Sequence, residues 1–394
     1  MTPSYLGTLR VPDAQALPHL QELCDLREPY AHTPDTQRLF DLAMTEINAW
    51  HRQRNEFWRA LTNTDTSPAP PIPAAFFKRH EALSVPRENI ALHLTSSGTS
   101  GQKSQMFFDH WTINAAQRMV ARIFAHYGWH TPDAQVDYLL LSYEPQRDLK
   151  VGTSFTNTYL CDFAPARHIT YALRCASARG TSAPGTEGAS KSPTHEFDPF
   201  GSLRAIECAA ADGIPLRIFG FPAFLAALLR RREALGHPPL RLAPESLVFL
   251  GGGWKNHADQ QIPQTELRAL ISRTLGIAPE RIRDSFGSVE HCVPVVECTR
   301  HRLHLPVWSR AVIRDVATLD PLPHGRRGFL HLISPYITSV PAHSVLMGDI
   351  ASAHPADECG CGAQTDWIIL HGRAGVSRNR SCAIAAAELL KGRA

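Results

Sequence analysis

The sequence predicts an α/β protein with mixed sheets and helices, because short apolar runs alternate with longer amphipathic stretches along the chain. The runs with the character of buried strands are, in order, 91–94, 136–142, 216–220 and 246–253. Helical stretches at 110–127 and 221–236 alternate with these runs, and this alternation favours parallel strands. With 394 residues, 43% of them hydrophobic, the chain is long enough to bury a large core.

The first part of the chain predicts an N-terminal helical region, taken as 1–70. Apolar residues recur every three or four positions through 14–62, and the long amphipathic stretch 39–61 contains no Gly or Pro. The proline-rich segment 67–77 breaks the pattern, because proline fixes φ and favours an extended conformation in the preceding residue. It connects the helical region to a core domain expected at 71–372.

Within the core, the segment 176–196 is rich in Ser, Gly, Thr and Pro and is predicted to be a mobile loop. Shorter β-type runs predict a β-rich subdomain at 293–370. A short C-terminal segment, 373–394, ends in a predicted helix and contains one lysine, Lys391, whose role the sequence does not assign.

Composition excludes several classes of function. The formal net charge of +3 disfavours nucleic acid as a partner. No apolar run approaches a membrane span, and the N-terminus has no signal-peptide pattern, so we expect a cytoplasmic protein. Nine scattered cysteines argue against a secreted disulfide framework, which leaves thiol chemistry or metal ligation to explain any special cysteine.

A Ser/Gly-rich turn after the apolar run 91–94 is the first chemical signal. It lies at 95–104, and its backbone N–H groups and hydroxyls could surround a polyphosphate, with Lys103 within reach. The alternative is an ordinary flexible surface turn. It is not a Walker loop, because the GxxxxGK[ST] spacing is absent.

This loop is followed, in order, by Gly251–Lys255, Phe286–Glu290, Gly348–Asp349 and Gly372–Arg373. The set resembles the motif order of adenylate-forming enzymes. More narrowly, the segments IPAAFFKRHEAL at 72–83, GGGWK and GVSRNRSCAIAAAELL are similar to the acyl-protein synthetase family, which is related to phenylacetate-CoA-ligase-like enzymes. That family supplies the activating subunit of the bacterial bioluminescence fatty-acid reductase.

The resemblance implies an adenylate-forming, acyl-CoA-ligase-like large domain with a truncated C-terminal segment. It also implies that the chain uses ATP and Mg²⁺ to convert a fatty or aryl acid to acyl-AMP. The residues implied to bind the nucleotide are Thr95, Ser96, Ser97, Gly98, Thr99, Ser100, Gly101, Gly252, Gly253, Trp254, Phe286, Gly287, Ser288 and Asp349.

Individual roles follow from the same resemblance. Lys103 would contact the phosphates, although this chain has Gln102-Lys103 where most of the superfamily has Pro-Lys. Glu290 would hold Mg²⁺, Asp349 would accept hydrogen bonds from the ribose, and Arg373 would lie at a hinge. The alternatives are a solvated carboxylate for Glu290 and a turn residue for Asp349.

Cys382 occupies the place where the acyl-protein synthetases carry their acyl group. Arg378 and Arg380 would lower the pKa of the thiol, as would a helix beginning at Ala383. The alternative is a small buried helix residue. The resemblance implies that the acyl group moves from AMP to Cys382 and then to a partner acyl reductase.

Two other functions stay open. The first is a ligase that delivers the acyl group to coenzyme A or an acyl-carrier protein without using Cys382. The second is a degenerate nucleotide-binding subunit that keeps the fold for assembly, which pyrophosphate exchange would distinguish from an enzyme.

Cys298, His304, Cys359 and Cys361 predict a structural zinc site. Cys-x5-His in one β-type segment and Cys-Gly-Cys-Gly in another supply three thiolates and one imidazole, the ligand set of a closed tetrahedral centre. Some phenylacetate-ligase-like relatives have similar Cys and His placement. His301 is a competing ligand, and the alternative is a pair of reduced cysteines with no metal.

Overall fold

The structure, a computed structural model, describes residues 8–63, 71–95, 105–145, 156, 158–175, 195–254 and 261–374. The chain divides into two compact units that do not follow chain order. Unit 1 comprises Met1–Thr131 and Arg283–Asn379, and unit 2 comprises Pro132–Ile282 and Arg380–Ala394.

Unit 2 is built on a mainly parallel sheet with strand order β8-β7-β4-β5-β6. Its strands are β4 (Val136–Tyr143), β5 (Ala166–Cys175), β6 (His195–Phe197), β7 (Leu216–Gly220) and β8 (Leu247–Gly251). Neighbouring strands are parallel except for β6, which pairs antiparallel with β5. Every residue of β4 and β7 is buried, as expected of central strands covered on both faces. Three of the four strands expected from the sequence therefore lie in this sheet.

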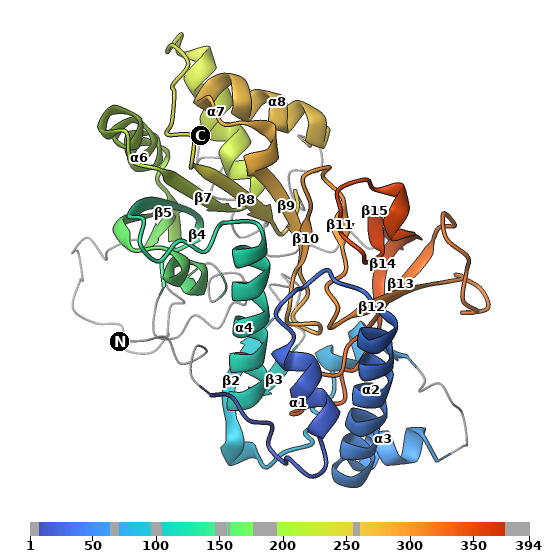
Figure 1. The fold of residues 1–394 in the computed structure, drawn as a ribbon. Helices are drawn as coiled ribbons and strands as arrows, with labels where there is room; N and C mark the ends of the chain where they lie inside the picture. Colours follow the sequence, from blue (N-terminus) through green and yellow to red (C-terminus); the bar gives the residue numbers. More distant parts are fainter. Residues whose placement is uncertain are drawn as a thin grey trace, which may run out of the picture. The chain divides into compact units, whose positions relative to one another are not determined.

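Helices complete the core in the described part of unit 2, and α7 and α8 lie side by side (Figure 1). They are α6 (Pro199–Asp212), α7 (Pro222–Ala234) and α8 (Gln264–Leu275), with short 3-10 helices η4 (Cys161–Phe163) and η5 (Pro279–Arg281). Asp198 caps α6 by accepting a hydrogen bond from the amide of Gly201, and α6 and α8 end at glycines with positive φ, Gly213 and Gly276. The expected loop 176–196 lies outside the described residues except for its last two, which begin β6.

Unit 1 contains a mostly antiparallel sheet with strand order β12-β13-β14-β15-β11-β10-β9. Its strands are β1 (Ile72–Pro73), which pairs parallel with β14, β9 (Ile282–Phe286), β10 (Val295–Glu297), β11 (Leu303–His304), β12 (Arg310–Arg314), β13 (Gly328–Ile333), β14 (Ser344–His354) and β15 (Trp367–Arg373). The 3-10 helices in the described residues of this unit are η2 (Ala74–Lys78), η3 (Arg87–Asn89) and η6 (Ala356–Glu358). The short strands agree with the β-type runs of the sequence.

The remaining strand predicted to be parallel, 91–94, is instead part of an antiparallel pair. Strand β2 (Ile90–Thr95) pairs with β3 (Gln105–Asp109), so the two strands flank the Ser/Gly-rich segment. Asp109 then caps helix α4 (His110–His126) by accepting a hydrogen bond from the amide of Thr112 at 2.7 Å. The expectation of a parallel strand here is wrong, because the chain returns through β3 before the helix begins.

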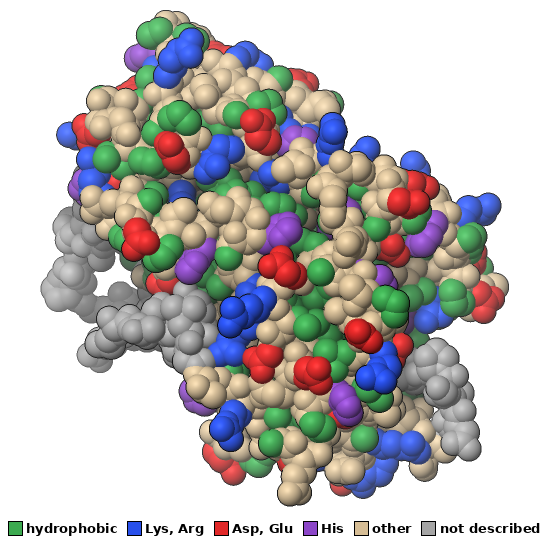
Figure 2. Space-filling view, in the orientation of Figure 1, with side chains coloured by type: hydrophobic (Ala, Val, Ile, Leu, Met, Phe, Trp, Pro, Cys, Tyr) green, Lys and Arg blue, Asp and Glu red, His purple; other side chains and the backbone are tan. Residues whose placement is uncertain are grey.

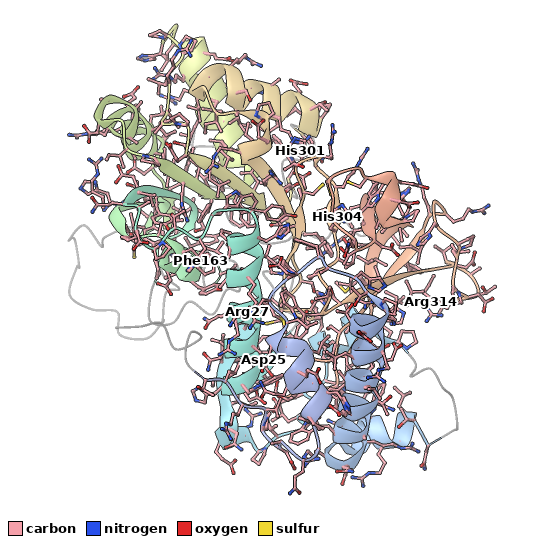
Figure 3. The ribbon with its side chains drawn as sticks, in the orientation of Figure 1. Asp25, Arg27, Phe163, His301, His304 and Arg314 are labelled. Atoms are coloured by element: carbon pink, nitrogen blue, oxygen red, sulfur yellow. The ribbon has the colours of Figure 1, made fainter. Side chains whose placement is uncertain are left out.

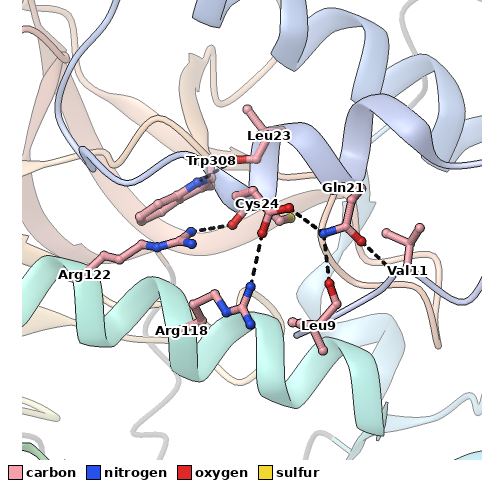
Figure 4. A network of polar contacts seen from close by, with 9 residues as sticks. Leu9, Val11, Gln21, Leu23, Cys24, Arg118, Arg122 and Trp308 are labelled. Carbon is pink, nitrogen blue, oxygen red and sulfur yellow. Dashed lines mark hydrogen bonds and ion pairs between the residues drawn. The ribbon is translucent and has the colours of Figure 1, made fainter. Parts of the chain in front are cut away.

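The N-terminal helices of unit 1 are α1 (Pro18–Asp25), α2 (Pro34–Arg54) and α3 (Glu56–Leu61). Figure 4 shows how α1 is fixed to α4 and to the turn before β12. Arg118 pairs with Asp25 at 3.1 Å, Arg122 donates to the carbonyl of Cys24, and the indole of Trp308 donates to the carbonyl of Leu23 at 2.9 Å. This region is therefore part of the packed unit.

Acidic and basic side chains are interspersed on the face shown in Figure 2. Within the described ranges, none of the helices has the length and apolarity needed to cross a membrane. The described cysteines are all free thiols.

Candidate active site and metal centre

Four sulfur and nitrogen ligands converge in unit 1. The ligand atoms of Cys298, His304, Cys359 and Cys361 all lie within 4.8 Å of one another. Cys298 follows β10, His304 ends β11, and the other two cysteines follow η6. The structure thus brings together the four residues whose spacing predicts a tetrahedral site, two from each of two segments.

Their separations fit a metal site and not a disulfide. Cys298 Sγ lies 3.6 Å from Cys359 Sγ, and Cys361 Sγ lies 3.4 Å from His304 Nε2. A disulfide requires about 2.05 Å. A zinc ion about 2.3 Å from each sulfur and about 2.0 Å from nitrogen would separate tetrahedral ligands by roughly 3.5 to 3.8 Å.

The backbone supports the sulfurs. The amide of Arg300 donates to Cys298 Sγ at 3.3 Å, and the amide of Ala363 donates to Cys361 Sγ at 3.4 Å. Gly360 and Gly362 adopt φ of 68° and 92°, which lets the chain fold tightly around Cys361. Burial and the neighbouring sulfurs raise the pKa of Cys359 to about 12, so its thiolate needs a positive partner.

The imidazole of His304 is oriented for ligation. His304 is fully buried, and its Nδ1 lies 2.7 Å from the carbonyl oxygen of Thr365, so Nδ1 carries the hydrogen and Nε2 faces the sulfurs. The ring of Tyr30 lies edge-on to it, with ring centres 6.2 Å apart. A backbone acceptor on one nitrogen is the usual way a ligating histidine is held.

His301, the competing ligand, takes another place (Figure 3). It adopts φ of 57° in the turn between β10 and β11, and its Nδ1 lies 3.4 Å from Glu297 Oε2. Close by, buried Arg283 lies over the rings of Tyr127 and Trp129 and donates to the carbonyl of Glu297. His304, and not His301, joins the four-ligand cluster.

A second polar feature follows β9, where Ser288 and Glu290 form a compact turn. Ser288 Oγ donates to Glu290 Oε2, and the amide of Glu290 donates to Ser288 Oγ at 3.2 Å. Glu290 is only 6% exposed, and among the described residues its Oε1 has no hydrogen-bond partner. A buried carboxylate with one uncommitted oxygen fits Mg²⁺, which prefers carboxylate oxygen.

The turn also contains two other residues of the motif. Phe286 ends β9 half-buried, and Gly287 is exposed. A Cβ built at Gly287 would meet no atom within 4 Å, so the structure leaves open space beside this glycine.

Asp349 and Arg373 meet across β14 and β15. They are paired in the antiparallel register, and Arg373 Nε lies 3.3 Å from Asp349 Oδ1. The Asp349 side chain is 12% exposed and that of Arg373 is 57% exposed. The two motifs GD and GR, which are separated in sequence, therefore form one ion pair.

In unit 2, the GGGWK segment follows β8. Gly252 and Gly253 adopt φ of 80° and 66°, and a Cβ at Gly252 would come 2.7 Å from the ring of Phe221. Trp254 is 5% exposed and belongs to the hydrophobic core of this unit. The glycines are thus required by backbone conformation and close packing.

Several predicted site residues lie outside the described residues. Of the phosphate loop, only Thr95 is described, at the end of β2 and paired with Gln105. The others are Ser96, Ser97, Gly98, Thr99, Ser100, Gly101, Lys103 and Cys382.

Comparisons with known proteins show which family and which fold this chain is similar to. The family model described as acyl-protein synthetase, LuxE, matches residues 44–149 and 189–391. A long-chain-fatty-acid–luciferin-component ligase of Vibrio harveyi is 26% identical over 283 residues, covering 71% of this chain and 68% of that protein. A protein of the same name from Aliivibrio fischeri is 24% identical over 338 residues, covering 83% of this chain and 82% of that protein.

Among solved structures, a 2-hydroxyisobutyryl-CoA ligase in complex with 2-HIB-AMP and CoA is similar with a TM-score of 0.61. The sequence identity is 15%, and the match covers 93% of this chain and 73% of that one. This likeness concerns the fold, and it confirms the predicted fold class.

Proposed function

The chain belongs to the acyl-protein synthetase (LuxE) family, and from that membership we propose that it activates a long-chain fatty acid with ATP and carries the acyl group on Cys382. The chain is an enzyme of the ligase class. The observation that carries the finer proposal is the family match, which extends to residue 391 and so includes the segment around Cys382.

In the first step, a carboxylate oxygen of the acid attacks the α-phosphorus of ATP. A P–O bond forms, the bond to pyrophosphate breaks, and acyl-AMP and pyrophosphate result. Negative charge develops on the phosphoryl oxygens, so the site has to supply donors and a cation and needs no protein nucleophile. Bound Mg²⁺ would neutralise part of that charge.

The described residues suit this step. Glu290 would hold Mg²⁺ through its uncommitted Oε1, while Ser288 fixes the other oxygen. Asp349 would accept hydrogen bonds from the ribose hydroxyls, and the guanidinium of Arg373 holds its carboxylate in place. Thr95 and the loop after it, with Lys103, would hold the phosphates.

In the second step, the thiolate of Cys382 attacks the acyl carbonyl of acyl-AMP. A C–S bond forms, the C–O bond to AMP breaks, and AMP leaves. The thioester keeps enough reactivity for a further transfer to a thiol of a partner acyl reductase. Arg378 and Arg380, close to Cys382 in the sequence, would favour the thiolate electrostatically.

The test measures ATP–pyrophosphate exchange with a panel of fatty and aryl acids, and labelling of the protein by radioactive acid. We expect the parent to exchange with long-chain acids and to carry a hydroxylamine-sensitive label. Cys382→Ser should retain exchange and lose the label, whereas Cys208→Ser, at an exposed cysteine of α6, should retain both. Equal labelling of the Cys382 variant and the parent would contradict the relay.

The same experiment distinguishes the other functions. Efficient acylation of coenzyme A or of an acyl-carrier protein by a parent that never becomes labelled would replace the relay with a ligase that uses a free thiol acceptor. Absence of exchange with every acid would favour the degenerate nucleotide-binding subunit.

We also propose that the cluster of Cys298, His304, Cys359 and Cys361 binds a structural zinc ion. The ligand separations, the amide hydrogen bonds to sulfur and the orientation of His304 support it. Three sulfurs and one nitrogen fill a tetrahedral shell, so the site is closed and does not supply a catalytic metal.

Elemental analysis of protein purified without chelators tests this proposal. We expect about one equivalent of zinc per chain. A folded, metal-free protein would contradict it.

A further inference from the structure

We propose that Tyr336 and His291 are positioning residues that hold the turn carrying Glu290 in the conformation that binds Mg²⁺. This inference rests on the proposed role of Glu290. Neither residue belongs to a motif identified in the sequence, and Tyr336 lies 45 residues beyond His291, in the segment between β13 and β14.

The turn after Glu290 is tight and locally strained. The amide of Val293 donates to the carbonyl of His291 at 2.8 Å, which closes a three-residue γ-turn around Cys292. Cys292 adopts φ of 70°, in the left-handed region that only glycine enters without cost. Such a conformation persists only where its surroundings enforce it.

Tyr336, which lies outside the turn, stabilises the γ-turn conformation around Cys292. Its hydroxyl donates to the carbonyl of His291 at 2.7 Å, the same carbonyl that closes the γ-turn. Tyr336 is fully buried, and burial raises the pKa of its hydroxyl well above the usual value, so it remains a donor. The hydroxyl therefore fixes the backbone next to Glu290.

The imidazole of His291 completes the network. Its Nε2 lies 3.2 Å from the Tyr336 oxygen and its Nδ1 lies 3.3 Å from Ser334 Oγ. Because the Tyr336 proton goes to the carbonyl, Nε2–H donates to the Tyr336 oxygen, and Nδ1 accepts from Ser334. His291 is 3% exposed, so these hydrogen bonds lie in the interior of unit 1.

These contacts also orient the carboxylate of Glu290. The amides of His291 and Cys292 both donate to the carbonyl of Ser288, at 3.1 and 2.9 Å, and Ser288 also binds the Glu290 carboxylate. The hydrogen bond from Tyr336 to the carbonyl of His291 therefore also restrains the Glu290 carboxylate, because both belong to one hydrogen-bonded turn of five residues. Without it, Cys292 can relax to a negative φ, and Glu290 loses its fixed orientation.

The test uses Tyr336→Phe, which keeps the ring and removes the hydroxyl. ATP binding is measured by calorimetry with Mg²⁺ and with EDTA, and pyrophosphate exchange is measured across a Mg²⁺ titration. We expect the ATP affinity in EDTA to be unchanged. The factor by which Mg²⁺ increases ATP affinity should be about fivefold smaller than in the parent, the size expected for one lost hydrogen bond. The Mg²⁺ concentration for half-maximal exchange should rise by a similar factor.

Tyr138→Phe is the matched control, because Tyr138 is also a buried tyrosine whose hydroxyl donates to a backbone carbonyl, that of Ala164, but it lies in unit 2. It should leave the Mg²⁺ dependence unchanged. Cys292→Gly, which removes the cost of positive φ, should restore most of the Mg²⁺ response when combined with Tyr336→Phe. Ser334→Ala, a milder change, should shift the Mg²⁺ dependence about twofold in the same direction.

A Mg²⁺ response equal to that of the parent in both Tyr336→Phe and Ser334→Ala would overturn the inference. Glu290→Gln separates this failure from failure of the proposed function. If Glu290→Gln loses the Mg²⁺ response while Tyr336→Phe keeps it, only the positioning role is wrong. If Glu290→Gln keeps it, the role of Glu290 itself is wrong.

Discussion

The Cys/His cluster and the Glu290 turn are both polar sites in unit 1, and each depends on a buried imidazole. In the cluster, His304 is one of four ligands whose sulfurs and nitrogen face one another. In the turn, His291 is held by Ser334 and Tyr336, so the chain supplies every partner itself. In the proposed function, the first site would be stabilised by a bound zinc ion, whereas the second is held by protein contacts and would bind Mg²⁺ together with ATP.

The largest effect should come from breaking the first site. Cys361→Ser removes one ligand of the proposed zinc site and would leave two sulfurs and one imidazole uncompensated, so we expect loss of the metal and a fall in melting temperature of about 10 °C or more. Elemental analysis and a thermal melt measure both. The control is Cys208→Ser, which should change neither, and a Cys361 variant that melts like the parent would show that the cluster does not stabilise the fold.

Breaking the second site should affect chemistry and not stability. Glu290→Gln keeps the shape of the side chain but removes the charge proposed to hold Mg²⁺, so pyrophosphate exchange should fall at least tenfold while the melting temperature stays within about 2 °C. Parent-like exchange would remove Glu290 from the mechanism.

The ion pair of Asp349 and Arg373 should give a smaller effect. Asp349→Asn is expected to raise the KM for ATP about fivefold, because a ribose hydroxyl loses a charged acceptor. Stability should change by less than about 1 kcal/mol, since Arg373 is largely exposed. Glu233→Gln breaks the exposed pair with Arg273 in unit 2 and serves as the control, which should leave the KM unchanged.

A third buried imidazole, that of His343, has no hydrogen-bond partner among the described residues and should give the smallest effect of the series. His343 stacks on His51 and packs against Trp58, and among the described residues neither of its ring nitrogens has a hydrogen-bond partner. Burial lowers its pKa from 6.5 to about 3. The unfolded chain therefore binds a proton at this residue near pH 6.5, whereas the folded chain does not, and stability falls as the pH drops below 6.5.

From pH 7 to pH 6 this histidine should reduce the free energy of unfolding by about 0.7 kcal/mol. Denaturant unfolding at the two pH values measures this loss of stability. In His343→Phe the loss between pH 7 and pH 6 should be smaller than in the parent by about 0.7 kcal/mol. His237→Phe, at an exposed position, should not. An equal pH dependence in the parent and the His343 variant would contradict the assignment.

The sequence predicted elements where a single physical signal dominates. The apolar runs at 136–142 and 216–220 correspond to β4 and β7, because strands buried on both faces are apolar throughout. The convergence of Cys298 with Cys359 could be expected for a similar reason, since chemistry restricts such ligand sets to few arrangements.

Features that depend on pairing over long distances in the chain were not predictable in the same way. The strand at 91–94 has the composition of a buried strand, but its antiparallel partner at 105–109 decides its place. Tyr336 and His291 carry no motif, and only the fold brings the hydroxyl to the carbonyl. A histidine directly after the motif glutamate is the one sequence signal that could have directed attention there.

The attachment of the N-terminal helices has a consequence for synthesis of the chain. The indole of Trp50 donates to the carbonyl of Thr338, and that of Trp308 to the carbonyl of Leu23, pairs that are 288 and 285 residues apart. A ribosome adding about 5 to 20 residues per second needs roughly 15 to 60 s to make that intervening chain. During that interval the apolar faces of α1 and α2 lack these partners, so unit 1 can close only late in translation.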